Sequence, residues 1–150
     1  MATAPERERV SSELLQFIAG VVLHNVAVAG RLRLGVNELQ VLGLAQRAGR
    51  VTAGDVARQT GLTTGSVTGL IDRLVRAGYA SRTRDEADRR KVYITPNPDG
   101  LERIGPHYAA YGKHLSDVLD RRSSTELRVI GDFFAELNAV DTIVSPAPHP

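Results

Sequence analysis

The chain has 150 residues, 42% of them hydrophobic, and its 19 basic and 17 acidic side chains give a net charge of +2. The length corresponds to about one domain with enough apolar content for a core, and the absence of cysteine excludes disulfides, thiolate zinc sites and thiol redox sensing. Because no uninterrupted apolar run approaches the length that spans a bilayer, we expect a soluble cytoplasmic protein.

Charge is unevenly distributed along the chain. Residues 47–91 carry ten basic against five acidic side chains, whereas residues 1–46 are balanced and residues 92–150 are net acidic. Seventeen of the nineteen cations are arginine, whose guanidinium group suits paired hydrogen bonds to phosphate and guanine. The central third therefore favours a polyanionic partner, although a solvated charged surface would give the same pattern.

The N-terminal part predicts two helices. An apolar stripe indicates the first helix over residues 10 to about 31, which Ser11 or Ser12 could begin. The stripe consists of Leu14, Phe17, Ile18, Val21, Val22 and Val26. Asn37 is the expected cap of the second helix, which should be mostly buried and end near Gly49.

A helix-turn-helix is predicted next. Thr52 caps a short helix, and Asp55 three residues later completes an acidic relative of the capping box. A tight turn at residues 59–61 contains glycine, and a second helix follows from its cap Thr63 to Gly78, a residue suited to the left-handed conformation that ends helices. Apolar positions recur in this second helix at spacings of three and four, which buries one face and leaves the other for the major groove of DNA.

A hairpin and two helices complete the chain. Residues 79–84 and 91–95 favour strands, and a hairpin of that size is marginal alone and must pack on the preceding helix. Thr95 or Asn97 should cap the next helix, in which the Gly-Pro pair at residues 105–106 predicts a kink or a restart. A capping box begins the last helix, and its two members are Ser123 and Glu126.

The outer helices are too long and too apolar to be covered by the central region. A second copy of the chain is the economical cover, because a two-fold dimer also places two recognition helices about one duplex turn apart. We therefore expect a mainly α fold (an α+β winged helix) in one compact domain. It would contain an N-terminal dimerisation helix (1–35), a winged helix-turn-helix region (36–96), C-terminal dimerisation helices (97–142) and a disordered tail (143–150).

The order of these elements resembles the MarR family of winged-helix transcriptional regulators over nearly the whole chain. The most specific match is GSVTGLIDRLVRAGYASRTRDEADRRKVYIT at residues 65–95, with a Ser/Thr-containing recognition helix, an Asp-Arg-Leu segment, a glycine turn and an Asp-Arg-Arg wing. The resemblance implies a homodimer on pseudo-palindromic operators. It also implies a protein that usually represses and is often released by small anionic or phenolic ligands bound between its dimerisation and DNA-binding regions.

The chain departs from the family pattern in three places. Gly69 stands where many relatives have a larger, often basic residue, which could weaken backbone anchoring or change the preferred sequence. Two more residues than usual separate Thr95 from Gly100, so the family pattern does not determine how this segment joins the next helix. Without cysteine, the thiol-based peroxide sensing of the family is absent.

Ten residues are the candidates for DNA binding. Short hydroxyls and glycine at the start of the recognition helix can approach base edges and thymine methyls, although caps and plain surface need the same residue types. Arginines further along favour phosphate, Arg73 could instead pair with a carboxylate, and Arg90 matches the minor-groove arginine of the family wing. The candidates are Thr64, Gly65, Ser66, Thr68, Arg73, Arg76, Arg84, Asp88, Arg89 and Arg90.

Aromatic and histidine residues of the outer helices give a second candidate site. His24, Tyr108 and Tyr111 could line an effector pocket, and they could equally be core or interface residues. His107 and His114 lie seven apart on one helical face, but no carboxylate or thiolate completes a metal set, so we expect neither metal nor cofactor.

The sequence supports three classes of function unequally. A dimeric, sequence-specific DNA-binding regulator accounts for the most residues. A winged-helix module that only mediates protein contacts is the alternative, and the arginines of the wing argue against it. An enzyme has no support, because the sequence shows no catalytic triad, no phosphate-cradling glycine loop and no metal-binding pattern.

Overall fold

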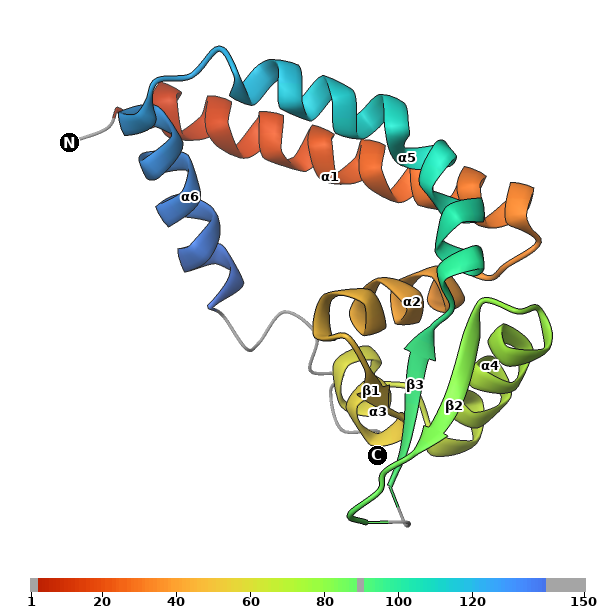
Figure 1. The fold of residues 1–150 in the computed structure, drawn as a ribbon. Helices are drawn as coiled ribbons and strands as arrows, with labels where there is room; N and C mark the ends of the chain where they lie inside the picture. Colours follow the sequence, from red (N-terminus) through yellow and green to blue (C-terminus); the bar gives the residue numbers. More distant parts are fainter. Residues whose placement is uncertain (1–2, 89–90, 140–150) are drawn as a thin grey trace.

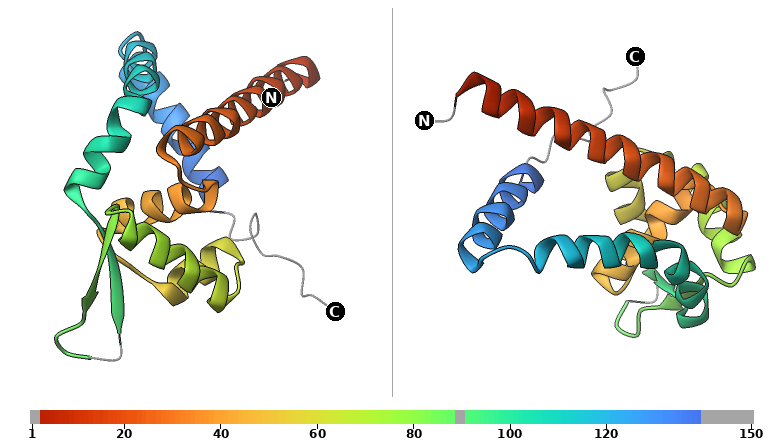
Figure 2. Two further views of the ribbon diagram at one scale, coloured as in Figure 1. Left: turned by 90° about the vertical axis from the view of Figure 1, so that its right-hand side faces the viewer. Right: turned by 90° about the horizontal axis from the view of Figure 1, so that it is seen from above.

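The structure is a computed structural model that describes residues 3–88 and 91–139. Three short helices and a small sheet form a winged-helix core, two long outer helices extend from it, and a third outer helix follows at their far end (Figure 1). The views in Figure 2 show the two longest outer helices, α1 (Ala4–Leu32) and α5 (Pro98–Leu119), diverging from each other away from the core. The outer helices therefore form an open frame over the core.

The first two helices begin at residues other than those expected. Helix α1 starts six residues early, because Thr3 and Glu6 form a capping box in which the Thr3 N–H donates to Glu6 Oε2 at 2.6 Å. Helix α2 (Val36–Ala48) has Gly35 rather than Asn37 as its N-cap, and the Glu38 carboxylate accepts the Gly35 N–H at 2.7 Å. The starts predicted at Ser11 or Ser12 and at Asn37 are wrong, because a Glu three residues into each helix stabilises an earlier start.

The helix-turn-helix forms as predicted. Helix α3 (Ala53–Thr60) is capped by Thr52, which forms the capping box with Asp55, and Gly61 ends it at a φ of 68°. Helix α4 (Thr64–Arg76) is capped by the Thr63 hydroxyl, which accepts the Ser66 N–H at 3.3 Å. Gly78 follows α4 with a φ of 74°, a left-handed conformation that costs glycine little.

The sheet has one strand more than the predicted hairpin. Strands β2 (Ala80–Arg84) and β3 (Val92–Pro96) pair antiparallel, and β1 (Val51–Thr52) joins the other edge of β3 to give the order β1-β3-β2. Ile94 lies opposite Val51 on one side and Arg82 on the other. A two-residue strand has no periodicity of its own, so only its pairing partner reveals it.

The hydrophobic core belongs to the winged helix. Its most deeply buried side chains include Ile71, Leu74 and Ile94, each at most 2% exposed. The cluster consists of Val41, Leu42, Ala45, Val51, Val56, Val67, Leu70, Ile71, Leu74, Tyr79, Ala80 and Ile94. Since α4 contributes four of these residues, one face of this helix is fixed against the core.

Helix α5 begins on the core and then bends away from it. A Cβ on Gly100 would lie 2.8 Å from the Tyr79 Cα, so this close approach requires glycine. Asn97 is the N-cap residue, but its side chain donates to the Gly78 carbonyl at 3.2 Å instead of capping the helix. Pro106 lies inside α5, which bends visibly over its first half (Figure 1) and confirms the predicted kink.

Helix α6 (Ser124–Asn138) closes the described chain. Its capping box joins Ser123 to Glu126 as predicted, and the hydrogen bonds from Ser123 lower the pKa of the Glu126 carboxyl. The tail that the sequence predicts to be disordered lies outside the described residues.

Apolar side chains of the outer helices remain exposed in the single chain. Leu15, Leu23 and Val129 are 67%, 71% and 64% exposed. Helix α1 is also long and apolar enough to cross a membrane by length and composition alone, although polar residues interrupt its sequence. A helix at the interface of a soluble protein can have the same length and composition. In a membrane or at an interface, the exposed apolar face of α1 would be covered.

Candidate nucleic-acid interface

The exposed face of α4 carries the residues predicted to contact base edges. Thr64, Gly65, Ser66 and Thr68 are all exposed, whereas Val67 is fully buried between them. The Thr68 hydroxyl donates to the Thr64 carbonyl at 2.9 Å, so its oxygen can still accept a hydrogen bond while the side chain remains exposed. The Ser66 oxygen accepts the Thr63 hydroxyl at 2.9 Å, so the Ser66 hydroxyl hydrogen can be donated to an outside group.

Neither glycine on this face is required by packing within the chain. A Cβ on Gly65 would meet nothing within 4 Å, and a Cβ on Gly69 would meet only the Arg73 guanidinium, at an ordinary 3.8 Å. Glycine in a helix interior costs about 0.5–1 kcal/mol relative to alanine. Two such residues on one exposed face therefore leave a low surface that a large partner can approach closely.

Arg73 is held by a carboxylate that the sequence does not reveal. Its Nε lies 2.5 Å from Glu38 Oε1, while the Arg73 side chain stays 57% exposed and that of Glu38 only 6%. The competing role predicted for Arg73 is therefore present in the fold. Glu38 lies 35 residues away in the chain, and only the packing of α2 against α4 brings the two together. Arg76 is exposed at the end of α4, where its Nε donates to the Asp72 carbonyl at 3.4 Å.

A second ion pair joins α4 to the wing. Arg82 Nη1 of β2 lies 2.6 Å from Asp72 Oδ1 of α4, with both side chains partly exposed. This contact fixes the hairpin beside the recognition helix, so that α4 and the wing can act on one duplex (Figure 1).

The loop of the wing is organised by Asp85. Its Oδ1 accepts the N–H groups of Ala87 and Asp88, each at 2.9 Å, and these bonds lower the pKa of the Asp85 carboxyl. The Asp88 carbonyl accepts the Lys91 N–H at 2.8 Å, and Arg84 is exposed at the end of β2. Arg89 and Arg90 lie outside the described residues, so their predicted roles stay predictions.

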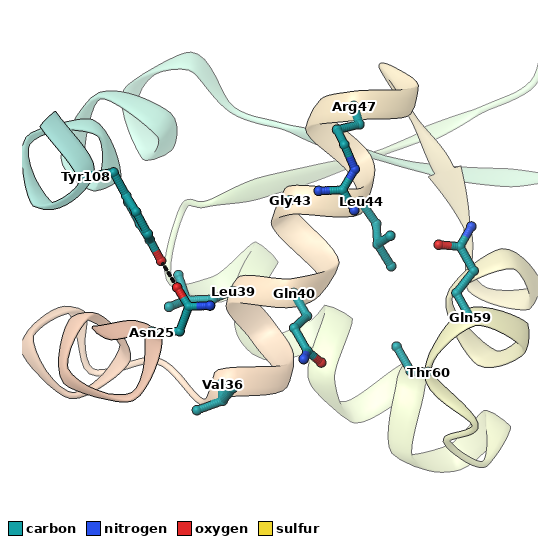
Figure 3. A pocket seen from close by; sticks show the side chains of 10 residues that line it. All are labelled: Asn25, Val36, Leu39, Gln40, Gly43, Leu44, Arg47, Gln59, Thr60 and Tyr108. Carbon is teal, nitrogen blue, oxygen red and sulfur yellow. Dashed lines mark hydrogen bonds between the residues drawn. The ribbon is translucent and has the colours of Figure 1, made fainter. Parts of the chain in front are cut away.

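A cavity of about 730 Å³ lies where α2 faces the outer helices and the end of α3. Figure 3 shows Tyr108 and Asn25 at one end of its lining and Gln59 and Thr60 at the other. The Tyr108 hydroxyl donates to Asn25 Oδ1 at 2.7 Å, and burial raises the pKa of Tyr108. The lining consists of Asn25, Val36, Leu39, Gln40, Gly43, Leu44, Arg47, Gln59, Thr60 and Tyr108.

The three predicted effector residues are close together but do not share this cavity. Tyr108 lines it, whereas Tyr111 lines a separate apolar hollow of about 540 Å³ between α1 and α5. His24 packs against both tyrosine rings, with centroids 5.2 Å apart in each pair, and its Nε2 lies 3.0 Å from the His107 carbonyl oxygen. Most of the cavity wall comes from α2, which sequence periodicity describes only as buried.

Two short helices with an exposed second helix, beside an antiparallel sheet that extends into a basic hairpin, define a winged helix-turn-helix protein. Residues 34–91 match the family model described as the MarR family. The chain is 33% identical to the uncharacterized HTH-type transcriptional regulator YcgE of Bacillus subtilis (strain 168). The similarity extends over 137 residues, which are 89% of each protein. The chain belongs to the MarR family of helix-turn-helix transcriptional regulators, and its relatives are regulators rather than enzymes.

Solved structures agree with this fold. Streptococcus pneumoniae FabT in complex with DNA superposes with a TM-score of 0.66 at 26% identity, over 88% of this chain and 94% of that one. NadR in complex with 4-hydroxyphenylacetate superposes with a TM-score of 0.65 at 21% identity, over 87% of this chain and 93% of that one. The mainly α winged-helix class predicted from the sequence is confirmed.

Proposed function

We propose that this protein is a cytoplasmic homodimer that binds pseudo-palindromic operators, with α4 of each copy in the major groove. The exposed face of α4 carries this proposal, because its hydroxyl side chains are exposed and packing within the described chain does not require its glycines. FabT, a relative by fold and sequence, was solved in complex with DNA. The exposed apolar faces of α1, α5 and α6 are the proposed dimer surface, and a second copy would cover them.

Each candidate residue receives a role within this interface. Thr64, Gly65, Ser66 and Thr68 would face base edges or their sugars, and Arg76 would contact phosphate. In the wing, Arg84 and Arg89 would add charge along the backbone, Asp88 would orient a guanidinium, and Arg90 would enter the minor groove. Arg73 would contact phosphate as well, and one duplex would touch all ten candidates: Thr64, Gly65, Ser66, Thr68, Arg73, Arg76, Arg84, Asp88, Arg89 and Arg90.

We propose further that the protein represses and that a small molecule releases it. A dimer on its operator excludes other proteins from the DNA that it covers, which accounts for repression. The cavity beside α2 has a volume within the usual range for ligand pockets, and it combines apolar walls with the Arg47 guanidinium. An aromatic or anionic effector fits these groups, and NadR was solved with an aromatic acid. Tyr108 would line the site, with His24 and Tyr111 packed behind it.

Titration of the purified protein on the DNA that flanks its own gene tests the function. Footprinting should show a protected pseudo-palindrome, and affinity should fall steeply with salt, because each neutralised phosphate releases counterions. Addition of small aromatic acids should lower operator occupancy. A chain that binds no duplex at low ionic strength would instead support the alternative of a protein-interaction module.

A further inference from the structure

Glu38 is the buried charged side chain of the described residues, and DNA recognition is not an evident reason for an acid at this position. Both of its oxygens are engaged. Oε2 accepts the Gly35 N–H at 2.7 Å, and Oε1 faces the Arg73 Nε at 2.5 Å. An acid beside a polyanion binding face would ordinarily repel the polyanion, so its burial against an arginine of the recognition helix needs an explanation.

The geometry assigns Glu38 as a positioning residue that holds Arg73 ready for one backbone phosphate of DNA. The Arg73 Nε faces Glu38, while the Arg73 side chain remains 57% exposed and, among the described residues, its two Nη groups have no hydrogen-bond partner. The planar guanidinium allows this division, because its five donors point in fixed directions. The Glu38 carboxylate is therefore almost fully buried, whereas the guanidinium that it holds is exposed to a partner.

The surroundings of Arg73 form a receptor for a phosphate. A cleft of about 340 Å³ opens between the start of α2 and the first turns of α4, and Ser66, Arg73 and Glu38 all line it, with the Glu38 carboxylate paired to the Arg73 Nε. The Ser66 oxygen accepts the Thr63 hydroxyl, so the Ser66 hydroxyl hydrogen is left without an acceptor among residues 3–88 and 91–139. A Cβ on Gly69 would lie 3.8 Å from the Arg73 Nη1, so glycine at this position keeps side-chain atoms of residue 69 away from the guanidinium. The cleft therefore offers a hydroxyl and a guanidinium edge to one anion.

This assignment rests on the proposed DNA-binding function and predicts the direction in which DNA affinity changes when the charge of Glu38 is removed. Removal of a negative charge should strengthen DNA binding if Glu38 acts only through its charge. Since Glu38 positions Arg73, we expect Glu38→Gln to weaken operator binding about tenfold although the protein becomes more positive. Gln keeps an acceptor for the Gly35 N–H and loses the one that holds the arginine. Glu102→Gln, which makes the same charge change at an exposed residue of α5, should leave affinity unchanged or slightly higher.

A double-variant cycle separates positioning from a general structural effect. Arg73→Gln should weaken binding and reduce the slope of log affinity against log salt by about one, the value for one lost phosphate contact. In that background Glu38→Gln should cost nothing further, because its partner is already gone. Arg73→Lys should bind more weakly than the wild type, since an ammonium group on a flexible stem lacks the fixed planar donors that the guanidinium divides between the acid and a phosphate.

Gel-shift titrations at several salt concentrations give all of these values, with thermal unfolding of each variant as the check on folding. The assignment is overturned if Glu38→Gln binds as tightly as the wild type, if its loss adds fully to that of Arg73→Gln, or if Arg73→Lys is indistinguishable from the wild type. A Glu38→Gln protein that fails to fold leaves the Arg73→Lys result to decide. Failure of the wild-type protein to bind any duplex would instead reject the proposed function itself.

Discussion

The winged-helix core and the outer helices differ in how completely the single chain buries their apolar side chains. In the core, twelve buried residues from helices α2, α3 and α4 and the sheet form one cluster, so that α4 has a fully covered face. In the outer frame α6 contains no buried residue, and α1 has only Val28 and Ala29, both near the core. The single chain therefore buries the apolar side chains of the core and leaves those of the outer helices exposed.

This difference supports the proposal that one fold binds DNA through its core and a ligand beside it. A complete core keeps the exposed face of α4 rigid, as readout of base edges requires. The open frame carries apolar stripes that a second copy would cover, so the spacing of two recognition helices would depend on the outer helices. The cavity at α2 lies at the junction of the two regions, where a ligand could change their relation.

The largest expected effect comes from a charge on the open frame. Leu15→Glu should weaken dimerisation by about 4 kcal/mol, because an unpaired polar group costs about 1–3 kcal/mol when buried and a two-fold interface buries it twice. Gln16→Glu is the matched control, since the next residue lies about 100° around the helix. Sedimentation equilibrium measures both proteins. Unchanged association of Leu15→Glu would show that this face of α1 is not the interface.

Removal of a core side chain should act within each chain instead. Leu74 is fully buried, and Leu74→Ala should lower the free energy of unfolding by about 3 kcal/mol at every protein concentration. The exposed Arg76→Ala on the same helix should change it by less than about 0.5 kcal/mol. Urea titrations at two concentrations give the values, and a loss that vanishes at high concentration would contradict a self-contained core.

Local signals in the sequence predict most of the elements. Capping residues mark the starts of α3, α4 and α6, and three-four spacing finds the faces of the helices. Ser11, Ser12 and Asn37 indicate the wrong starts for α1 and α2, because several residue types can cap a helix. The acid at the third helical position selects the actual start.

Contacts between distant residues could not be predicted in this way. The pairs Glu38–Arg73 and Asp72–Arg82 arise because the fold packs α2 and β2 against α4, and no spacing along the chain encodes them. The cavity has the same origin, since Asn25, Arg47 and Tyr108 come from three different helices. The exposed face of the recognition helix was predictable because its pattern lies within one helix.

The wing offers a test of charge placement in the two regions. Arg90→Ala should weaken operator binding about tenfold, about 1.4 kcal/mol, and leave dimerisation unchanged, because a narrow minor groove attracts an inserted arginine. Lys113→Ala removes an exposed cation from α5 in the outer frame, where it pairs with Asp117, and should have little effect on DNA affinity. Gel-shift titration compares the two, and equal losses would show that only net charge matters.

The smallest effect concerns sequence preference. Thr68→Ala should cost about 1 kcal/mol on the operator and almost nothing on random DNA, since base contacts discriminate while phosphate contacts do not. Because the Thr68 hydroxyl already donates to the Thr64 carbonyl at 2.9 Å, the methyl group is the part left to meet a thymine methyl.

Two further variants of Thr68 decide between the methyl group and the hydroxyl. Thr68→Val keeps a methyl in the same place and should retain the preference, whereas Thr68→Ser keeps only the hydroxyl and should lose it. Competition titrations with operator and scrambled duplexes measure the ratio. The reverse order would show that the Thr68 oxygen accepts a hydrogen bond from a base. Since α4 is fixed to a complete core, either order would report on the base contact itself rather than on movement of the helix.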